Sequence, residues 1–254
     1  MHKNYLIILA IAGFTCLYSC NNKNNEEKVT TVMADTLPSP SIDSSLRITD
    51  TLESKISQQN NFLDSIALLP DSAFIELARY SNSFKLDIRY ATDNNFTKQA
   101  LYDCANCLLR KIVADSLVAA QQELIKLGYG MLLFDCYRPI SVQQKMWEIV
   151  PNPIYVADPQ KGSMHNRGNA VDLSLYDLET GTPLDMGTEF DFFGREAHHA
   201  YQGLSEEVLQ NRLLLKSTLE KYGFKSITSE WWHYSFNAKV FRISDEPVPC
   251  ISQD

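Results

Sequence analysis

The chain has 254 residues, of which 44% are hydrophobic and 21% are charged, so a wholly disordered or fibrous protein is excluded. Its formal net charge of -8 offers no basic surface for nucleic acid, and we expect no nucleic-acid partner. The mean hydropathy of -0.22 excludes a protein with many membrane spans.

The first twenty residues have the pattern of an export signal. Lys3 precedes an apolar run from Tyr5 to Leu17, which is shorter than the roughly 20 residues that a membrane span needs. The string Leu17-Tyr18-Ser19-Cys20 resembles the lipobox of a bacterial lipoprotein, which implies cleavage after residues 1–19 and a lipid on Cys20. A plain secretory signal or a tethering helix is the alternative. Either way the mature chain leaves the cytosol. With the lipoprotein interpretation we expect a location in the cell envelope, on the periplasmic side or the cell surface, with Cys20 as the membrane anchor.

Residues 20–69 are polar and rich in Asn, Ser, Thr, Asp and Gln, with only a weak apolar period between Leu46 and Leu63. Such a segment buries too little apolar surface to offset its chain entropy. We expect a flexible stalk that could include a helical turn near 52–69, followed by one folded domain over 70–254.

The folded part mixes helices and strands without a regular βαβ repeat. This favours an α+β fold, with a small, mainly antiparallel sheet and helices packed on it. In chain order the patterns predict a strand at 84–90, a helix at 108–127 ended by Gly128, a strand at 131–136, a helix at 141–149 capped by Ser141, a strand at 170–175, a helix at 205–222 closed by Gly223, and a strand at 231–236.

Two of the five histidines lie in distinctive strings. His165 belongs to Ser163-Met164-His165-Asn166-Arg167-Gly168-Asn169-Ala170-Val171-Asp172, in which the small Gly168 allows a tight turn. Asp172 lies between apolar residues of a predicted strand, an unusual place for a carboxylate unless it is paired or binds a metal. His233 ends the string Glu230-Trp231-Trp232-His233, with Glu230 at the start of the same strand.

Two histidines and one carboxylate suit zinc, and three protein ligands leave a position for a reactive water. Glu230 is then the natural base for that water. The residues alone leave other interpretations open. Each histidine could be an ordinary core or surface residue, Asp172 a strand-end cap, and Glu230 a surface carboxylate.

The motif Ser163-x-His165-x-x-Gly168-x-Ala170-x-Asp172 with Glu230-x-x-His233 resembles the zinc D-Ala-D-Ala peptidase superfamily. Four further strings resemble its VanX-type D-alanyl-D-alanine dipeptidase branch, and together the resemblance covers about 74–236. These strings are Asp87-Ile88-Arg89-Tyr90-Ala91-Thr92-x-Asn94-Asn95-Phe96-Thr97, Asp135-x-Tyr137-Arg138-Pro139, Asp185-Met186-Gly187-Thr188-x-Phe190-Asp191 and Glu230-Trp231-Trp232-His233-Tyr234.

The resemblance implies the fold of this superfamily and a role for each matched residue. It implies one Zn²⁺ per chain bound by His165, Asp172 and His233, and Glu230 as general base and acid. It also implies that Arg138 stabilises the tetrahedral intermediate, while an ion pair with Asp135 is the alternative, and both can hold. Ser163 and Asp191 match positions near the bound dipeptide. Asp191 could receive the substrate ammonium or cap a helix.

The implied activity is hydrolysis of D-alanyl-D-alanine in the envelope, for cell-wall turnover or D-Ala recycling, with a small D,D-dipeptide as substrate and no protein partner. The alternatives are a D,D- or L,D-carboxypeptidase that trims peptidoglycan stem peptides, and a catalytically silent zinc-binding module. Four aromatic residues could wall a small cavity, although ordinary core packing is favoured for most of them: Tyr137, Phe190, Trp231 and Trp232.

Four cysteines remain after the predicted cleavage and lipidation: Cys104, Cys107, Cys136 and Cys250. An even number in an exported domain permits disulfides. Cys104 and Cys107 could pair locally or form half of a metal knuckle, and Cys136 fits a buried free thiol. The connectivity stays open. For the adjacent His198 and His199 a surface or packing role is favoured over a second metal site.

Overall fold

The computed structural model describes residues 42–81 and 83–250. The predicted signal, the lipidation site Cys20 and the first part of the predicted stalk lie outside these residues. The chain divides into two units, Met1–Thr51 and Leu52–Asp254, and the second contains the sheet and the candidate site. In the described part of the chain, no helix is both long enough and apolar enough to cross a membrane.

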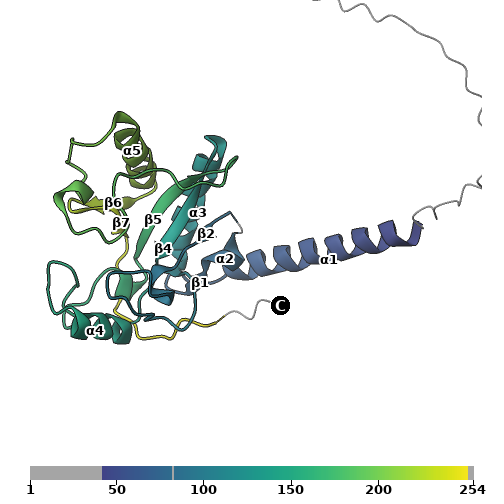
Figure 1. Ribbon diagram of the computed structural model, residues 1–254. Coiled ribbons are helices and arrows are strands. Elements are labelled where there is room, and N and C mark those ends of the chain that lie inside the picture. The colour runs from purple at the N-terminus through teal and green to yellow at the C-terminus, as the bar shows by residue number, and fades with distance from the viewer. Residues whose placement is uncertain (1–41, 82, 251–254) are drawn as a thin grey trace, which may run out of the picture. The chain divides into compact units, whose positions relative to one another are not determined.

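A five-stranded sheet with the order β2-β4-β5-β7-β6 forms the centre of the described domain (Figure 1). Only the β2–β4 pairing is parallel, and the other three are antiparallel. The predicted α+β class with a mainly antiparallel sheet is therefore confirmed. The strands are β2 (Lys85–Leu86), β4 (Tyr129–Asp135), β5 (Ala170–Asp177), β6 (Phe224–Ile227) and β7 (Glu230–Phe236).

Helices α3 (Lys111–Lys126) and α5 (Glu206–Lys221) pack against the sheet and against each other. The helix α4 (Ile140–Ile149) lies at the opposite end of the domain from α5 (Figure 1). As predicted, α5 begins after Ser205, whose hydroxyl accepts a hydrogen bond from the Val208 amide at 3.2 Å. Fully buried aliphatic side chains from β4, β5 and the two helices fill the core, among them Leu117, Leu124, Met131, Leu133, Leu173, Leu175, Leu215 and Leu219.

A two-stranded ribbon of β1 (Phe74–Glu76) and β3 (Leu108–Arg110) adjoins the sheet, with the short helix α2 (Leu77–Tyr80) after β1. The predicted helix at 108–127 therefore begins three residues too early. Residues Leu108–Arg110 form the strand β3 instead, because their backbone pairs with β1, and the helix starts after them. The predicted end is confirmed, since Gly128 adopts a left-handed conformation with φ of 89° directly after the helix.

Two further predictions are wrong in detail. The predicted strand at 84–90 is reduced to β2, because the chain turns into a 3₁₀ segment at Arg89–Ala91. The side-chain amide of Asn95 donates to the Arg89 carbonyl there at 3.2 Å. Ser141 is not the cap of α4. The helix begins at Ile140 after Pro139, and the Ser141 amide bonds the Asp245 carboxylate instead.

The predicted flexible stalk also needs correction, because residues Ile42–Ala67 form the helix α1. Its last turns carry apolar side chains at helical spacing, and Ile66 is only 3% exposed. The Arg79 guanidinium lies 4.4 Å from the ring centre of Phe62, and the Gln59 amide bonds the Arg79 carbonyl at 3.2 Å. Packing against α2 thus stabilises a helix that polarity alone does not suggest. The predicted domain boundary at residue 70 stays a prediction.

Candidate metal centre

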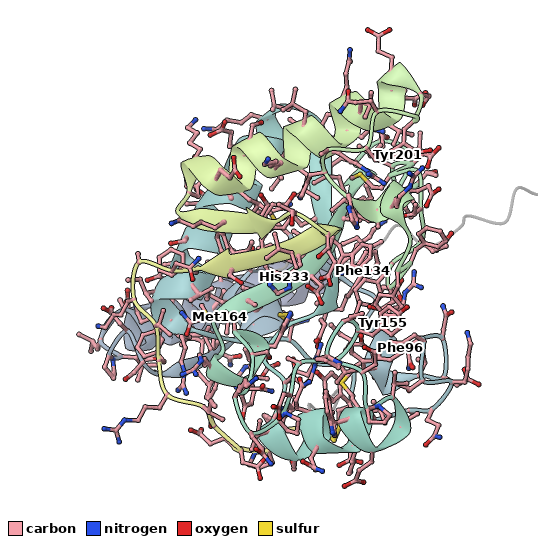
Figure 2. The ribbon with its side chains drawn as sticks, turned by 90° about the vertical axis from the view of Figure 1, so that its left-hand side faces the viewer. Phe96, Phe134, Tyr155, Met164, Tyr201 and His233 are labelled. Carbon is pink, nitrogen blue, oxygen red and sulfur yellow. A yellow bond between two sulfur atoms is a disulfide. The ribbon has the colours of Figure 1, made fainter. Side chains whose placement is uncertain are left out.

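Two of the predicted metal ligands are brought together by strand register. In the antiparallel β5–β7 pair Asp172 lies directly opposite His233, and the His233 Nδ1 atom lies 2.9 Å from the Asp172 Oδ1 atom. The neighbours Val171 and Leu173 point to the opposite face of β5, into the apolar core. In Figure 2, His233 lies in the middle of the domain, where the strands meet the loops at the α4 end.

The third residue, His165, comes from a tight turn before β5. A 3₁₀ segment at His165–Arg167 ends at Gly168, whose φ is 71°. The His165 Nε2 atom lies 3.1 Å from the Nδ1 atom of His233 and 3.3 Å from the Oδ1 atom of Asp172. A Cβ atom at position 168 would lie 2.6 Å from the Phe74 ring, so the predicted tight, crowded turn is confirmed.

The three side chains form a donor set that fits a metal ion. Their candidate ligand atoms all lie within 4.8 Å of one another, and no other such group occurs among residues 42–81 and 83–250. The His165 Nδ1 atom lies 2.7 Å from the Cys136 carbonyl, which can only accept, so this nitrogen carries the hydrogen and Nε2 presents a lone pair. Two imidazole nitrogens and a carboxylate oxygen are ligands that zinc prefers.

Electrostatics keep the Asp172 carboxylate ready to bind a cation. Burial raises its pKa, but the two histidines at hydrogen-bond distance outweigh burial and hold the pKa below its usual value. The side chain is only 4% exposed and is ionised at neutral pH. A metal ligand must be deprotonated, so the site is poised for a cation.

Arg138 is held beside this set by a buried carboxylate. The Asp135 Oδ2 atom accepts from Arg138 Nε at 3.1 Å and from Nη2, and the Gln143 side chain accepts from Nη1 at 2.9 Å. Tyr102 donates to the other oxygen of Asp135 at 2.6 Å. The ion pair that the sequence left open is therefore present. Burial lowers the pKa of Arg138, but the Asp135 charge outweighs it and raises the pKa well above its usual value.

Glu230 opens β7 and lies close enough to the metal set for mutual electrostatic effects. Burial raises its pKa, while the charge of His233 lowers it and that of Asp172 raises it further. A carboxylate with a raised pKa is a suitable proton acceptor and donor near neutral pH.

Asp191 lies near enough to the metal set for the charge of Asp172 to affect its carboxyl. Its backbone has a φ of 61°, and its Oδ2 atom accepts from the Tyr90 hydroxyl at 2.9 Å. Burial, and then the negative charge of Asp172, raise its pKa well above the usual value. With Phe96 and other residues it lines a cavity of about 410 Å³. The charge of Asp172 reaches the Asp191 carboxyl, but the lining of this cavity includes none of His165, Asp172 and His233.

Ser163 is engaged within its own turn. Its amide and hydroxyl bond the Asn166 side-chain oxygen at 2.7 and 3.0 Å. The Asn166 amide in turn donates to the Arg138 carbonyl at 2.8 Å, and the Arg138 amide donates to the His165 carbonyl at 3.1 Å. Ser163 therefore stabilises the turn that presents His165, and its role toward a substrate stays a prediction.

Several residues that support the site have no motif in the sequence. Tyr102 reaches Asp135 from 33 residues earlier in the chain, whereas Gln143 reaches Arg138 from the first turns of α4, five residues later, and no motif marks either residue. Ser235 is different. Its hydroxyl lies 2.9 Å from the His233 Nε2 atom, and strand alternation alone puts both residues on one face of β7.

The aromatic residues divide into two groups. Phe190 and Trp231 line a cavity of about 710 Å³, whereas Trp232 is 1% exposed. Tyr137 packs on Phe74 and bonds a backbone carbonyl away from the site. The lining of this cavity includes none of His165, Asp172 and His233, so the aromatic wall of a substrate cavity stays a prediction.

The adjacent histidines His198 and His199 differ in their surroundings. His198 is exposed. The ring centre of His199 lies 6.2 Å from that of Tyr234, in an edge-to-face arrangement. This geometry fits the favoured surface and packing roles.

The cysteines form two disulfides, Cys107–Cys136 and Cys104–Cys250. The interpretation of Cys136 as a free thiol is wrong, and so is local pairing of Cys104 with Cys107. A hydrogen bond of 2.9 Å from the Tyr137 amide to the Leu108 carbonyl brings β3 beside the end of β4, which places the Cα atoms of Cys107 and Cys136 5.3 Å apart.

A buried set of two histidines and one carboxylate, with a second carboxylate and a fixed arginine close by, defines the candidate centre of a metallohydrolase. Residues 71–253 match the peptidase M15 family model, described as D-Ala-D-Ala dipeptidase. The chain belongs to this family and is a metallopeptidase of the D-Ala-D-Ala dipeptidase type.

Similar curated proteins include three D-alanyl-D-alanine dipeptidases. The one from Escherichia coli K12 is 36% identical over 63% of this chain and 82% of its own. That from Enterococcus faecalis is 34% identical over 70% of this chain and 95% of its own. That from Enterococcus faecium is 35% identical over 69% and 94%.

One solved structure, titled "Structure of the LdcB LD-carboxypeptidase reveals the molecular basis of peptidoglycan recognition", covers 51% of this chain and 59% of its own at 21% identity. Its TM-score of 0.34 is too low to support a conclusion about this chain.

Proposed function

We propose that this protein is a zinc-dependent dipeptidase that hydrolyses D-alanyl-D-alanine and is anchored in the cell envelope by a lipid on Cys20. The convergence of His165, Asp172 and His233 into one buried donor set carries the catalytic part of the proposal. Family membership supports the substrate, since the matched model is that of D-Ala-D-Ala dipeptidases.

His165, Asp172 and His233 would hold the zinc ion, which would supply Lewis acidity for the scissile carbonyl and would lower the pKa of the attacking water to about 7. The chain supplies the proton transfer. Glu230 takes the proton from the attacking water and delivers it to the departing amine. Its raised pKa brings it closer to the working pH, where a group can serve in both directions.

Arg138 stabilises the oxyanion that develops on the scissile carbonyl. Its guanidinium is already oriented by Asp135 and Gln143, so little reorganisation is needed when charge appears. Asp191 receives the ammonium group of the substrate, and the cation favours its ionised form despite the raised pKa. Ser163 is proposed to lie near the bound dipeptide.

The envelope location is supported by the lipobox-like string at residues 17–20 and by the disulfides, which persist in oxidising compartments. There the enzyme serves cell-wall turnover or D-Ala recycling. Cys20→Ala is expected to abolish incorporation of labelled palmitate and to release the protein from membranes. Equal labelling of the variant contradicts the anchor without affecting the catalytic proposal.

The decisive experiment compares hydrolysis of D-Ala-D-Ala with release of D-Ala from a muropeptide pentapeptide, with and without a chelator. We expect chelator-sensitive cleavage of the dipeptide and much slower cleavage of the pentapeptide. Glu230→Gln is expected to lower kcat by at least about 10³-fold while one zinc per chain remains bound. Glu207→Gln, on the exposed first turn of α5, is the matched control.

Three results would contradict this assignment. Faster cleavage of the pentapeptide indicates a carboxypeptidase. A zinc-loaded protein that cleaves neither peptide indicates a silent binding module. Unchanged turnover in Glu230→Gln removes the assigned base.

A further inference from the structure

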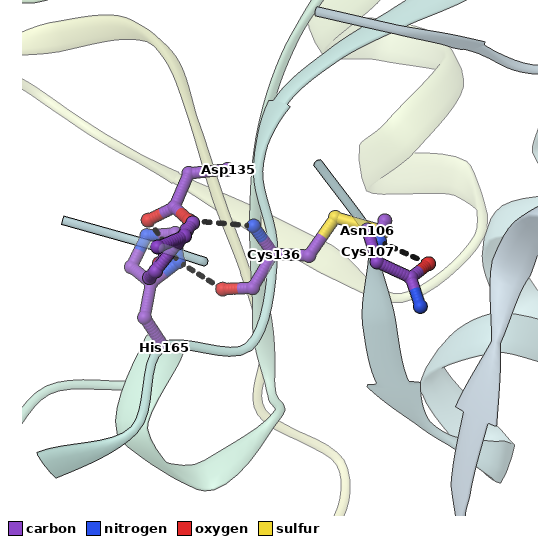
Figure 3. Close-up of a disulfide and its surroundings, with 6 residues drawn as sticks. Asn106, Cys107, Asp135, Cys136 and His165 are labelled. Atoms are coloured by element: carbon purple, nitrogen blue, oxygen red, sulfur yellow. Dashed lines mark hydrogen bonds and ion pairs between the residues drawn. A yellow bond between two sulfur atoms is a disulfide. The ribbon is translucent and has the colours of Figure 1, made fainter. Parts of the chain in front are cut away.

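The two disulfides start from one short loop and lead to different parts of the domain. Cys104 and Cys107 are three residues apart, yet Cys104 is bound to Cys250 near the C-terminus and Cys107 to Cys136 at the end of β4. The second bridge therefore enters the segment between Asp135 and Arg138, which borders the metal centre. Figure 3 shows this bridge, with Asp135 and His165 beside Cys136 and with Asn106 beside Cys107.

The backbone of Cys136 contacts the metal centre directly. Its carbonyl accepts the ring hydrogen of His165 at 2.7 Å, and its amide donates to the Asp135 side chain at 3.0 Å. Asp135 in turn holds the Arg138 guanidinium. One residue thus links the orientation of a metal ligand to the orientation of the oxyanion-binding arginine.

The other half of the bridge is held by burial and by hydrogen bonds to neighbouring segments. Cys107 is fully buried, its amide bonds the Asn106 side chain at 2.8 Å, and its carbonyl accepts from the Leu77 amide at 2.9 Å. Directly after it, β3 pairs with β1. The bridge is therefore a covalent tie between the β1–β3 ribbon and the last residues of β4.

We propose that the Cys107–Cys136 disulfide is a positioning element of the catalytic centre, which holds the Cys136 carbonyl where it fixes the ring of His165. Opening the bridge weakens metal retention and slows turnover, whereas opening Cys104–Cys250 does neither. This proposal builds on the proposed zinc dipeptidase function. Hydrogen-bond partners of metal-bound histidines set ring orientation, and their loss typically costs about 10- to 100-fold in metal affinity or activity.

The test compares two matched double variants of the full chain. Cys107→Ala with Cys136→Val removes the bridge while keeping the buried site apolar and close to its original volume. Cys104→Ala with Cys250→Ala removes the other bridge of the same loop, whose cysteines are more exposed. Zinc loss to a chelator, measured without substrate, is the first readout, and the separate values of kcat and KM are the second.

We expect the Cys107/Cys136 variant to lose zinc about 10- to 100-fold faster than the wild type and its kcat to fall by a similar factor, with KM within about threefold. The Cys104/Cys250 variant should stay within about twofold of the wild type in both readouts. Equal zinc loss and kcat in the two variants overturn the proposal. A wild type that binds zinc but cleaves no D,D-peptide contradicts the proposed activity alone. The comparison of zinc loss between the two variants still tests the positioning role of the disulfide.

If the Cys107/Cys136 variant does not fold, the bridge is opened chemically in the zinc-loaded Cys104/Cys250 variant. A phosphine breaks the S–S bond and is oxidised to the phosphine oxide with oxygen from water, and the two protons of that water end on the two sulfurs. Mass spectrometry after alkylation counts the thiols, and near-UV circular dichroism reports the fold. Zinc release in step with thiol formation supports the proposal, and a reduced, folded protein that keeps its zinc overturns it.

Discussion

Asp172 and His233 lie directly opposite each other on the antiparallel strands β5 and β7, with the carboxylate oxygen and the ring nitrogen 2.9 Å apart. Two ligands of the candidate metal centre are therefore positioned by the register of the sheet. His165, from the turn that leads into β5, completes the set. The affinity of the centre for zinc then depends on groups that fix the orientation of the histidine rings.

Ser235 is one such group, because its hydroxyl lies 2.9 Å from the His233 Nε2 atom. Ser235→Ala is expected to weaken zinc binding about tenfold, since the His233 ring loses the partner that orients it. Competition with a chromophoric chelator measures this change. Ser174→Ala, which changes a buried serine on β5 that lines the larger cavity, is the control. Equal zinc affinities of the two variants would show that Ser235 is dispensable.

No other cationic side chain should replace arginine at position 138 without loss of activity. Arg138→Lys keeps the charge but loses the planar fork that Asp135 holds, and we expect kcat to fall about 10²- to 10³-fold with little change in KM. Steady-state kinetics with D-Ala-D-Ala measures both constants. Arg89→Lys changes an arginine in the more exposed pair with Asp87 and should leave kcat within about twofold. A lysine variant with normal kcat would exclude the oxyanion role.

Removing the carboxylate that holds this arginine should affect stability as well. Asp135→Asn leaves the buried Arg138 without its counter-charge, and breaking a buried ion pair costs about 3–5 kcal/mol. Urea unfolding of the zinc-free protein measures this loss apart from catalysis. A loss below about 1 kcal/mol would mean that the pair is not buried in solution as it is in the structure.

Gly168 should be much less tolerant than Gly128, although both have a positive φ. An alanine costs roughly 1–2 kcal/mol at either position, because a Cβ atom disfavours the left-handed conformation. At Gly168 the added Cβ atom also overlaps the Phe74 ring, whereas at Gly128 nothing lies within 4 Å. We expect Gly168→Ala to unfold at lower urea and to bind zinc more weakly, because the turn that carries His165 must shift. Equal effects at both positions would contradict the crowding.

His199 predicts a pH dependence of stability that is independent of the metal centre. Burial, followed by the charges of Lys216 and Arg212, lowers its pKa from 6.5 to about 4, and Tyr234 faces it from β7. Below pH 6.5 the unfolded chain takes up a proton that the folded protein does not, so stability falls as pH drops from about 6.5 toward 4.

After allowance for its partial solvent contact, this one histidine should account for about 1 kcal/mol between pH 7 and pH 5. His199→Gln should remove that contribution, and His198→Gln, at the exposed neighbouring position, should not. Urea unfolding at the two pH values provides the measurement. Identical pH profiles for the wild type and His199→Gln would disprove the lowered pKa.

Helix ends and strand alternation were readable from the sequence where the signals are local. The Ser205 cap of α5 and the glycine after α3 follow from residues next to the helix ends, whereas the predicted Ser141 cap fails because the Ser141 amide bonds Asp245, 104 residues later in the chain. The local pattern predicts a helix over Leu108–Arg110, where the structure has a strand, because the pairing partner β1 lies more than thirty residues earlier in the chain. The same limit explains α1, whose last turns are stabilised by contacts with α2.

The sequence by itself determined the composition of the centre, since His165, Asp172, His233 and Glu230 stand in two compact motifs. The tertiary structure decided how they meet and what fixes them: the register of β5 against β7, the Asp135–Arg138 pair, and the bridge from Cys107 to Cys136. The physical reason is the range of the forces involved. Motifs record residue types within a few positions, whereas register, buried ion pairs and disulfide partners depend on surfaces that come together only when the core packs.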